Sequence, residues 1–576
     1  MERTSKAGKV RSYYFIALCL VSLFLYGSAV AGGTAVGGNN GGSKGNATLP
    51  AGPPALFFSD LTSAPKTGWE GSQTKGAAVT VWGENLGLIR GGNYITVNGA
   101  QLINDSDYAE WGVTQNNARG LERITFWLNN NAANGTGEIT VTVSGVTSNP
   151  LDFTVRPGNI YFIAKNGQDS NNGRYASAQA GGDGPWLHFY KANVQKNISL
   201  NAGDIVYVRS GVYNGEDEQG YMLYFRGLKG TASNPFSIVG YPGEWPVLGR
   251  SSPGNGVHTE ICCGYGTTNY LGLHKLAWEN RGVPVSVIGA GLRMVGDIFR
   301  YNTADVWSGI VDTGGGWDWK LYGLIFRDTG HDYYKHAIYI RSTHKESHNV
   351  DIGWDEFDNY RSDLPTKDGN AGYGSGAVNF RNDNNNSSVN HIYIHNCLFH
   401  NMPTATALYL ENDSSGNMNN IFFYNNILDG VGHTGTESCT SAILANAKYV
   451  YIYNNIFYNV GSPDGHNLRD GTFDGKPMSA MRIIKGPVFS ANNIFYMTNP
   501  AIPYLWDQRG TLVLRNDIYF GGKSLPSGAK YTLINPITSG PRFIGPSNHN
   551  LHLQKDSPAI NTGTSEVGSI VKWDYD

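Results

Sequence analysis

The segments YIHNCLF (393–399), FFYNNIL (422–428) and YIYNNIF (451–457) share one pattern: a short strand-like run, an asparagine, and a closing apolar residue. Related segments are LYGLIF (321–326), DIGWDEF (351–357), FSANNIF (489–495) and VLRNDIY (513–519). The closing aromatic or leucine stands at 326, 357, 399, 428, 457, 495 and 519, so it recurs every 24 to 42 residues. A repeat of short strands at such spacings predicts a solenoid whose coils carry loops of variable length.

A column of asparagines marks the turn inside these segments. Asparagine tolerates left-handed backbone geometry, and stacked asparagine side chains hydrogen-bond one another along a column. We therefore predict a structural role for this column. Its members are Asn396, Asn425, Asn454, Asn492 and Asn516.

A second strand column lies further along each coil, and each of its strands begins with alanine. The strands are AIYIR (337–341), AVNFR (377–381), ALYLE (407–411), AILAN (442–446) and AMRII (480–484). Side chains alternate between the two faces of a strand, and neighbouring strands lie about 4.8 Å apart. If the aliphatic set fills the core, the other set forms one contiguous outward patch. That set is Tyr339, Arg341, Asn379, Arg381, Tyr409 and Glu411.

The stretch from Ile160 to Tyr213 resembles the opening of secreted right-handed parallel β-helix proteins of the pectin-lyase-like superfamily, which includes polysaccharide lyases. The matching residues are Gly167, Asp169, Pro185, Trp186, Ala192, Gly203, Asp204, Val206, Val208, Gly211 and Tyr213. FIGPSNHNLHLQKDSPAINTGT (543–564) resembles the closing segment of such proteins. The resemblance implies an all-β fold with a right-handed parallel β-helix over residues 157–576.

The preceding residues 54–156 read as alternating strands separated by turn residues, which predicts a small β-sandwich. Within them, GAAVTVWGENLG (76–87) resembles the signature of TIG/IPT domains, which are immunoglobulin-like modules. The resemblance implies a spacer or a docking surface.

The N-terminus predicts export. Basic residues precede the apolar run YYFIALCLVSLFLYG (13–27), and Ala29-Val30-Ala31 fits a cleavage site, so residues 1–31 are read as a signal peptide. An uncleaved membrane anchor is the alternative. Residues 32–53 are rich in Gly, Asn and Ser and predict a flexible linker. We expect a secreted or cell-surface monomer with no membrane span after cleavage. The net charge of −3 provides no positive field that would attract nucleic acid, so no nucleic-acid partner is expected.

The outward patch fits β-elimination of an acidic, uronate-containing polysaccharide. A base must remove the proton next to the carboxylate while cations stabilise the charge that forms. Predicted catalytic residues are Lys335, His336, Arg341 and Arg381. Predicted substrate-binding residues are Tyr334, Tyr339, Asn379, Tyr409 and Glu411. Hard oxygen ligands for Ca²⁺ could come from Asp383, Glu411 and Asp413.

Two other readings remain open. A glycoside hydrolase would use two carboxyl groups, with candidates Asp355, Asp358, Asp383, Glu411 and Asp413. A non-catalytic glycan-binding or adhesin protein would need only a polar, aromatic surface, and the arginines would then form a plain charge ladder. The fold does not decide between these functions.

Overall fold

The computed structural model describes most of the chain after residue 51. The described residues are 52–68, 75–114, 120–193, 197, 199–214, 223–224, 230–249, 261–262, 267–280, 283–302, 309–329, 336–360, 376–383, 387–412, 417–432, 441–463, 478–507, 511–525 and 531–569. The predicted signal peptide and nearly all of the predicted linker lie outside these ranges. Over the described residues, no helix is long and apolar enough to cross a membrane.

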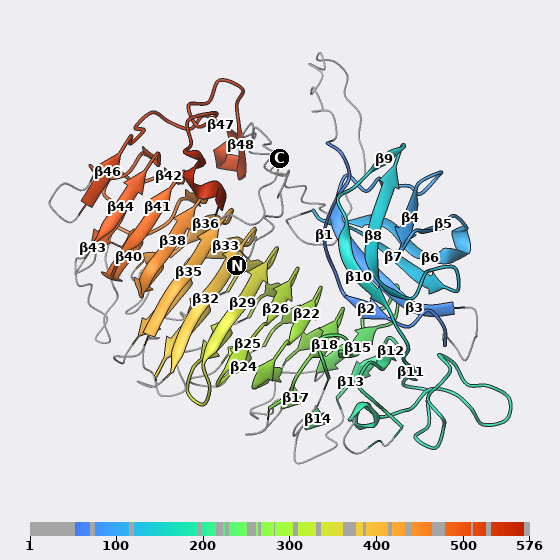
Figure 1. Ribbon diagram of the computed structural model, residues 1–576. Coiled ribbons are helices and arrows are strands. Elements are labelled where there is room, and N and C mark those ends of the chain that lie inside the picture. Colours follow the sequence, from blue (N-terminus) through green and yellow to red (C-terminus); the bar gives the residue numbers. More distant parts are fainter. Residues whose placement is uncertain are drawn as a thin grey trace, which may run out of the picture.

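Residues 55–155 form a sandwich of two β-sheets (Figure 1). One sheet has the order β1-β3-β7-β6, and the other has the order β2-β10-β8-β4-β5 with β9 paired to β8. Alternating apolar side chains such as Val79, Phe126 and Val141 fill the space between the sheets. The strands are β1 (Ala55–Ser59), β2 (Ser63–Ala64), β3 (Lys75–Glu84), β4 (Tyr94–Val97), β5 (Ala100–Leu102), β6 (Tyr108–Thr114), β7 (Glu122–Asn129), β8 (Gly135–Val143), β9 (Val146–Thr147) and β10 (Leu151–Val155).

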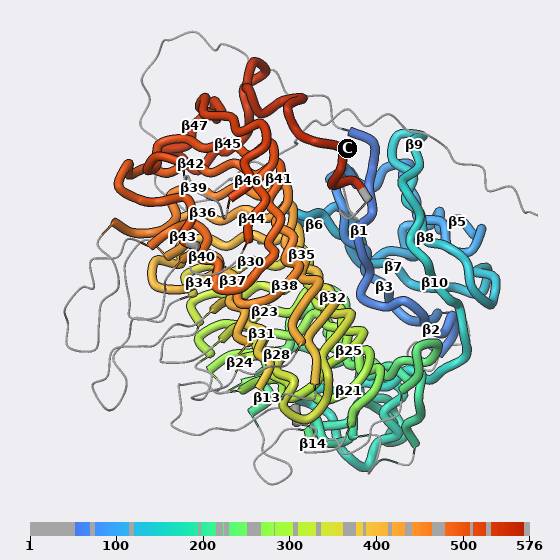
Figure 2. Tube along the Cα trace, turned by 60° about the vertical axis from the view of Figure 1, so that its left-hand side comes forward, coloured from blue at the N-terminus to red at the C-terminus, as the bar shows by residue number. Residues whose placement is uncertain are grey.

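From Ile160 onward the chain winds into a right-handed parallel β-helix with three long sheets, which confirms the predicted fold class (Figure 2). Sheet 1 contains β11 (Ile160–Ile163), β12 (Ile205–Val208), β15 (Phe236–Gly240), β18 (Leu271–His274), β22 (Arg293–Val295), β26 (Lys320–Tyr322), β29 (Ser347–Gly353), β32 (Ser388–His395), β35 (Asn417–Tyr424), β38 (Lys448–Tyr453), β41 (Val488–Ala491), β44 (Leu512–Arg515) and β46 (Tyr531–Ile534), with the short β21 (Gly289–Ala290) and β25 (Gly316–Trp317) beside it.

Sheet 2 contains β13 (Val212–Tyr213), β16 (Val247–Gly249), β19 (Ala277–Glu279), β23 (Ile298–Arg300), β27 (Ile325–Arg327), β30 (Glu356–Asp358), β33 (Leu398–Met402), β36 (Ile427–Val431), β39 (Ile456–Tyr458), β42 (Ile494–Tyr496) and β45 (Ile518–Phe520). Sheet 3 contains β14 (Leu223–Tyr224), β17 (Ile261–Cys262), β20 (Val285–Ser286), β24 (Gly309–Thr313), β28 (His336–Arg341), β31 (Gly376–Asn382), β34 (Thr406–Asn412), β37 (Ser441–Asn446), β40 (Ser479–Lys485) and β43 (Leu505–Asp507). From β12 to β43, the chain passes through sheets 1, 2 and 3 in turn in each coil.

Short helical turns and one hairpin complete the fold. The hairpin pairs β47 (Phe543–Gly545) with β48 (Asn550–Leu553). The helical turns are η2 (Asp105–Asp107), η3 (Phe189–Ala192), η4 (Pro546–Asn548) and η5 (Ser565–Ser569).

The closing aromatic column of the sequence repeat runs through the core of the helix. The positions 326, 357, 399, 428, 457, 495 and 519 pair in register from strand to strand of sheet 2. The Phe326 and Phe357 rings stack at 5.0 Å, and the Phe357 and Phe399 rings stack at 4.7 Å. This confirms the coil register that the repeat predicts.

The asparagine turn consists of two adjacent columns with different functions. Asn425 and Asn454, in the predicted column, adopt left-handed φ angles of 56° and 55°. The hydrogen-bonded column is the next one, so the predicted side-chain ladder was placed one residue too early. Asn455 Nδ2 donates to Asn493 Oδ1 at 3.0 Å, and Asn493 Nδ2 donates to Asp517 Oδ1 at 3.0 Å.

The asparagine ladder ends on a buried carboxyl group whose titration is testable. Burial raises the pKa of Asp517 to about 6, above that of the unfolded chain. Between about pH 4 and 6 the folded protein therefore holds this proton more tightly, and the free energy of unfolding falls as pH rises through this window. Asp517→Asn is expected to raise that free energy by about 1–2 kcal/mol near neutral pH and by almost nothing near pH 4.

Equilibrium denaturation at both pH values measures this effect. Asn493→Asp, which adds a second acid to the same column, serves as the opposite control and is expected to destabilise at neutral pH. A gain from Asp517→Asn that is equally large at both pH values would contradict the titration argument.

The sandwich lies beside the β-helix (Figures 1 and 2). Aromatic side chains pack it against the turn between sheets 1 and 2. The Phe58 ring lies 5.3 Å from Trp82 within the sandwich and 5.2 Å from Trp354 of the helix. Tyr207 of β12 reaches across as well, since its hydroxyl donates to the Ala78 carbonyl at 3.0 Å and accepts from the Ala78 N–H at 2.8 Å. The two domains therefore share a buried, specific interface.

Candidate functional site

The predicted outward patch exists on the outer face of sheet 3. Ile338, Val378 and Leu408 pair across β28, β31 and β34 and lie in the core, as the alternation predicts. The intervening residues fall into two outward rows. One row is Tyr339, Asn379 and Tyr409, and the other is Arg341, Arg381 and Glu411. We call these six residues, together with Asp312, the sheet 3 patch.

Asp312 extends the first row by one strand, because it pairs in register with Tyr339. Its carboxylate accepts from Arg341 Nη2 at 3.1 Å, and burial raises the pKa of Asp312 to about 6 although Arg341 opposes this shift. Sequence reasoning missed Asp312. Its strand carries Ile310 at the position where the other strands carry alanine, but the alternation in GIVDT (309–313) was available as a signal.

Arg381 lies between two carboxylates. Its Nη1 is 3.2 Å from Glu411 Oε2, and its Nε is 3.3 Å from Asp383 Oδ1. The other Asp383 oxygen accepts from Thr343 Oγ1 at 2.9 Å. Asp383 and Glu411 were predicted as Ca²⁺ ligands, yet a guanidinium already stands between them and neutralises their charge.

His336 lies at the base of the patch. Its Nε2 accepts from Asn379 Nδ2 at 3.0 Å, and its Nδ1 lies 3.2 Å from the Gly376 carbonyl oxygen and 3.1 Å from the Gly376 nitrogen, contacts that suit a neutral ring. Burial lowers the pKa of His336 to about 3, in agreement with a neutral ring. His336 is buried, with 2% of its surface exposed, and it orients Asn379 from below the patch.

Asn379 links the two rows. Besides His336, its Nδ2 donates to Glu411 Oε1 at 2.9 Å. Its Oδ1 is buried and accepts no hydrogen bond within the described part of the chain, and neither does the buried Nε of Arg341 find an acceptor there. An acceptor and a donor with unused bonding capacity thus lie on neighbouring strands of one patch, as expected where a polar ligand binds.

Tyr339 is a proton-bearing side chain of the patch and, like His336, is buried with 2% of its surface exposed. Its ring lies 5.0 Å below the Arg341 guanidinium. Burial, reinforced by the charge of Glu411, raises the pKa of Tyr339 above its ordinary value, so the phenol keeps its proton at neutral pH. The Arg341 and Arg381 side chains remain 27% and 24% exposed, so both cations reach the solvent above this phenol.

Three predicted site residues, Tyr334, Lys335 and Asp413, lie outside the described residues. Two hydrolase candidates lie elsewhere in the fold. Asp355 is fully buried and accepts from the Leu324 N–H at 2.8 Å, which makes it part of the turn. Asp358 lies on the outer face of sheet 2.

Sheet 2 carries the one group of metal-ligand type found among the described residues. Glu356, Asp358 and His400 offer ligand atoms that all lie within 4.8 Å of one another. Arg327 also contacts this group, because its Nη2 lies 3.0 Å from Glu356 and its Nε lies 3.1 Å from Asp358. As at the sheet 3 patch, an arginine already supplies the positive charge.

The chain is thus an all-β protein in which a parallel β-helix presents a compact cluster of arginines, acids and tyrosines on one sheet. No protein-family model matches it, and no curated protein does. Among solved structures, a pectate lyase is 13% identical, with 73% of this chain and 94% of that chain covered and a TM-score of 0.34. A rhamnogalacturonan lyase is also 13% identical, with 71% and 97% covered and a TM-score of 0.34. A mannuronan C-5 epimerase module from Azotobacter vinelandii is 12% identical, with 61% and 94% covered and a TM-score of 0.28. Similarity at this level concerns the fold alone.

Proposed function

We propose that the protein is secreted and cleaves an acidic polysaccharide by β-elimination at the sheet 3 patch. The observation that carries the proposal is the pair Arg341 and Arg381, in register on neighbouring strands and partly exposed, above the protonated Tyr339. Two adjacent guanidinium groups suit the carboxylate of a uronate residue. Their charge favours the enolate-like state that forms when the neighbouring proton is removed.

In the proposed reaction, a base removes the proton on the carbon next to the carboxylate. The electron pair forms a carbon–carbon double bond, and the bond to the glycosidic oxygen breaks. Tyr339 gives its proton to the departing oxygen. Tyr409, partly exposed on the same row and in register with Asn379, is assigned as the base, and Lys335 is the alternative from the sequence.

Tyr339→Phe tests the assigned acid. The substitution keeps the ring that packs under Arg341 and removes only the hydroxyl. Loss of a positioned general acid is expected to lower kcat about a hundredfold, with little change in KM. Steady-state kinetics and a thermal unfolding curve check this together. An unchanged kcat in a folded variant would remove Tyr339 from the mechanism.

The hydrolase alternative meets a distance problem. Asp312 is the patch carboxyl group with a raised pKa, as a general acid requires. Its strand, β24, is three strands from β34, which holds Glu411, and this corresponds to about 14 Å at the usual strand spacing. Paired carboxyl groups of glycosidases lie about 5–9.5 Å apart. Asp383 and Glu411 lie closer together, but the Arg381 guanidinium stands between their carboxylates and neutralises both. Elimination therefore fits the patch better.

Calcium is not assigned a step in this proposal, because Arg381 already neutralises Asp383 and Glu411. Exhaustive chelation is expected to leave the rate of elimination unchanged. The rate with EDTA and with added Ca²⁺ measures this. A rate that collapses with EDTA and recovers with Ca²⁺ would show that the arginines do not suffice.

The proposed function is tested by incubating the protein with a panel of uronate polysaccharides and neutral glycans. A rise in the ultraviolet absorbance of unsaturated uronate supports elimination. New reducing ends without that absorbance indicate hydrolysis. If neither appears while a glycan is retained in an affinity gel, the protein is a binding module.

A further inference from the structure

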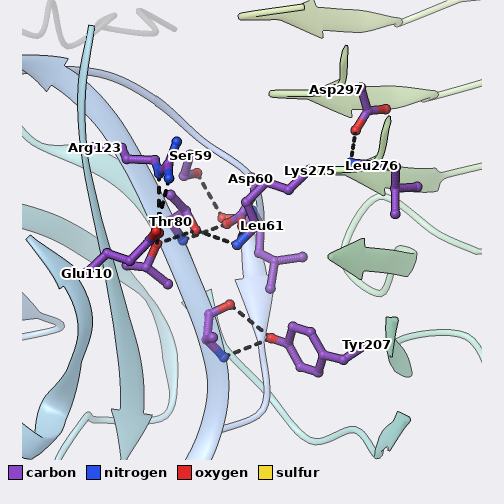
Figure 3. A network of polar contacts seen from close by, with 12 residues as sticks. Ser59, Asp60, Leu61, Thr80, Glu110, Arg123, Tyr207, Lys275, Leu276 and Asp297 are labelled. Atoms are coloured by element: carbon purple, nitrogen blue, oxygen red, sulfur yellow. Dashed lines mark hydrogen bonds and ion pairs between the residues drawn. The ribbon is translucent and has the colours of Figure 1, made fainter. Parts of the chain in front are cut away.

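A buried lysine of the β-helix reaches into the sandwich. Lys275 lies in the turn between β18 and β19 with a left-handed φ of 56°, which turns its side chain out of the coil. Its amine approaches Asp60, at the end of β1, with 3.4 Å between Nζ and Oδ2 (Figure 3). The side chains of Lys275 and Asp60 are 5% and 0% exposed. This pair is therefore closed off from bulk water.

The two carboxyl oxygens of Asp60 have different surroundings. Oδ1 accepts from the main-chain N–H groups of Leu61 at 2.7 Å and of Thr80 at 2.8 Å. Oδ2 faces Lys275 and accepts no hydrogen bond from any residue that the structure describes. Two N–H groups on one oxygen stabilise negative charge there when a nucleophile adds to the carbon. The other oxygen is the one that can leave.

A chain of hydroxyl groups connects the lysine to a carboxylate (Figure 3). Lys275 Nζ donates to Thr80 Oγ1 at 2.8 Å, and that hydroxyl lies 3.0 Å from Thr125 Oγ1. Thr125 then donates to Glu110 Oε2 at 2.8 Å. All these bonds can point in one direction, so a proton can pass from the amine to Glu110.

The charges in this cluster suit such a transfer. Burial lowers the pKa of Lys275, although Asp60 and Glu110 oppose the shift, so the nucleophilic neutral amine becomes more accessible. Burial also pushes the pKa of Glu110 upward, but Arg123 outweighs it and holds the pKa below its ordinary value. Glu110 is thus an ionised proton acceptor.

We propose that Lys275 and Asp60 condense into an amide bond that joins the sandwich covalently to the β-helix. A proton passes from the ammonium to the carboxylate, which gives an amine and a carboxylic acid. Nζ then bonds to Cγ of Asp60 while its surplus proton moves through Thr80 and Thr125 to Glu110. Glu110 returns that proton as the Cγ–Oδ2 bond breaks, and Oδ2 leaves as water. One ammonium and one carboxylate become one amide and one water, and no other reactant is needed.

Proximity favours the condensation of Lys275 with Asp60, because two groups held in contact react as if at a very high concentration. The product also removes two charges from a site where burial penalises both. The inference concerns the domain interface and is independent of the proposed activity.

The test is peptide mapping of the full-length wild-type protein by tryptic digestion and mass spectrometry. An amide at Lys275 blocks cleavage after that residue. We expect a branched species that joins peptide 45–66, which contains Asp60, to peptide 251–281, at the sum of their masses less one water. Recovery of unmodified peptide 45–66 together with a peptide that ends at Lys275 would overturn the proposal and leave an ion pair.

Matched controls are available in the same protein. Lys320 lies 3.0 Å from Asp351, but this lysine is 35% exposed and Asp351 is held by Tyr322 and His395, so trypsin is expected to cleave after Lys320. Asp60→Asn should give the same branched peptide with loss of ammonia from the side-chain amide. Glu110→Gln removes the proton acceptor and is expected to lower the linked fraction at least tenfold. An undiminished fraction in Glu110→Gln would overturn the assigned relay.

Discussion

Arg381→Ala is expected to lower kcat/KM on the uronate substrate about a thousandfold, the scale seen when a group that stabilises developing negative charge is removed. Arg381 is the patch cation in contact with two carboxylates, and its partly exposed guanidinium lies in register beside that of Arg341. Without it, the substrate carboxylate would face Glu411 and Asp383 with a single cation left to bind it. The loss should therefore appear in kcat as well as in KM.

Two further variants, one conservative and one at a distant arginine, serve as controls for this measurement. Arg381→Lys keeps the charge but loses the planar pair of donors, so an intermediate rate is expected. Arg300→Ala removes an arginine that pairs with Glu279 on the outer face of sheet 2, and it is expected to retain full activity. If Arg381→Ala stays folded and as active as Arg300→Ala, the sheet 3 patch is not the reactive site.

Asn455→Leu is expected to lower the free energy of unfolding by about 4 kcal/mol, because it leaves several buried polar groups without their hydrogen-bond partner. Asn455 Oδ1 accepts from the Asn426 N–H at 2.9 Å and from Asn426 Nδ2 at 3.1 Å. Its Nδ2 donates to the Phe423 carbonyl and to Asn493 Oδ1, each at 3.0 Å. Leucine has a similar volume but makes none of these bonds.

The neighbouring asparagine supplies the control for this stability measurement. Asn454 has a φ of 55°, which glycine adopts without strain, so Asn454→Gly should cost less than about 1 kcal/mol. Chemical denaturation of both variants under one set of conditions compares them. A larger loss at Asn454 than at Asn455 would mean that the hydrogen-bonded column has been assigned to the wrong residue.

This pair also shows where sequence reasoning reached its limit in the fold. The aromatic column was predictable, because Phe357 and Phe399 are the last residues of two segments with the same pattern, and both must lie in the core. The role of each asparagine in the turn was less predictable, because Asn425-Asn426 and Asn454-Asn455 are identical dipeptides. The pattern does not tell which asparagine takes the left-handed backbone and which faces the core.

The site was predictable to the extent that strand alternation governs it. Alternation in AIYIR and AVNFR fixes which side chains share the outer face, so Arg341 and Arg381 were expected to be neighbours. The residues that contact these two arginines were not predictable from strand alternation. Asp312 belongs to a strand without the alanine signature, and the burial of His336 depends on three-dimensional packing.

Contacts between the domains could not be predicted at all. Lys275 and Asp60 belong to different domains and are separated by more than two hundred residues. Neither stands in a motif, and no local pattern links them. Their contact follows from how the sandwich sits on the turn of the helix, which only the three-dimensional structure specifies.

The most direct test of the central claim is the chemistry of the products formed in water labelled with oxygen-18. Elimination breaks the glycosidic bond without adding water, so mass spectrometry should find oligosaccharides with an unsaturated uronate end and no label from bond cleavage. Hydrolysis would instead give saturated products that carry one labelled oxygen for each bond cleaved. The first result would support elimination at the sheet 3 patch, and the second would contradict it.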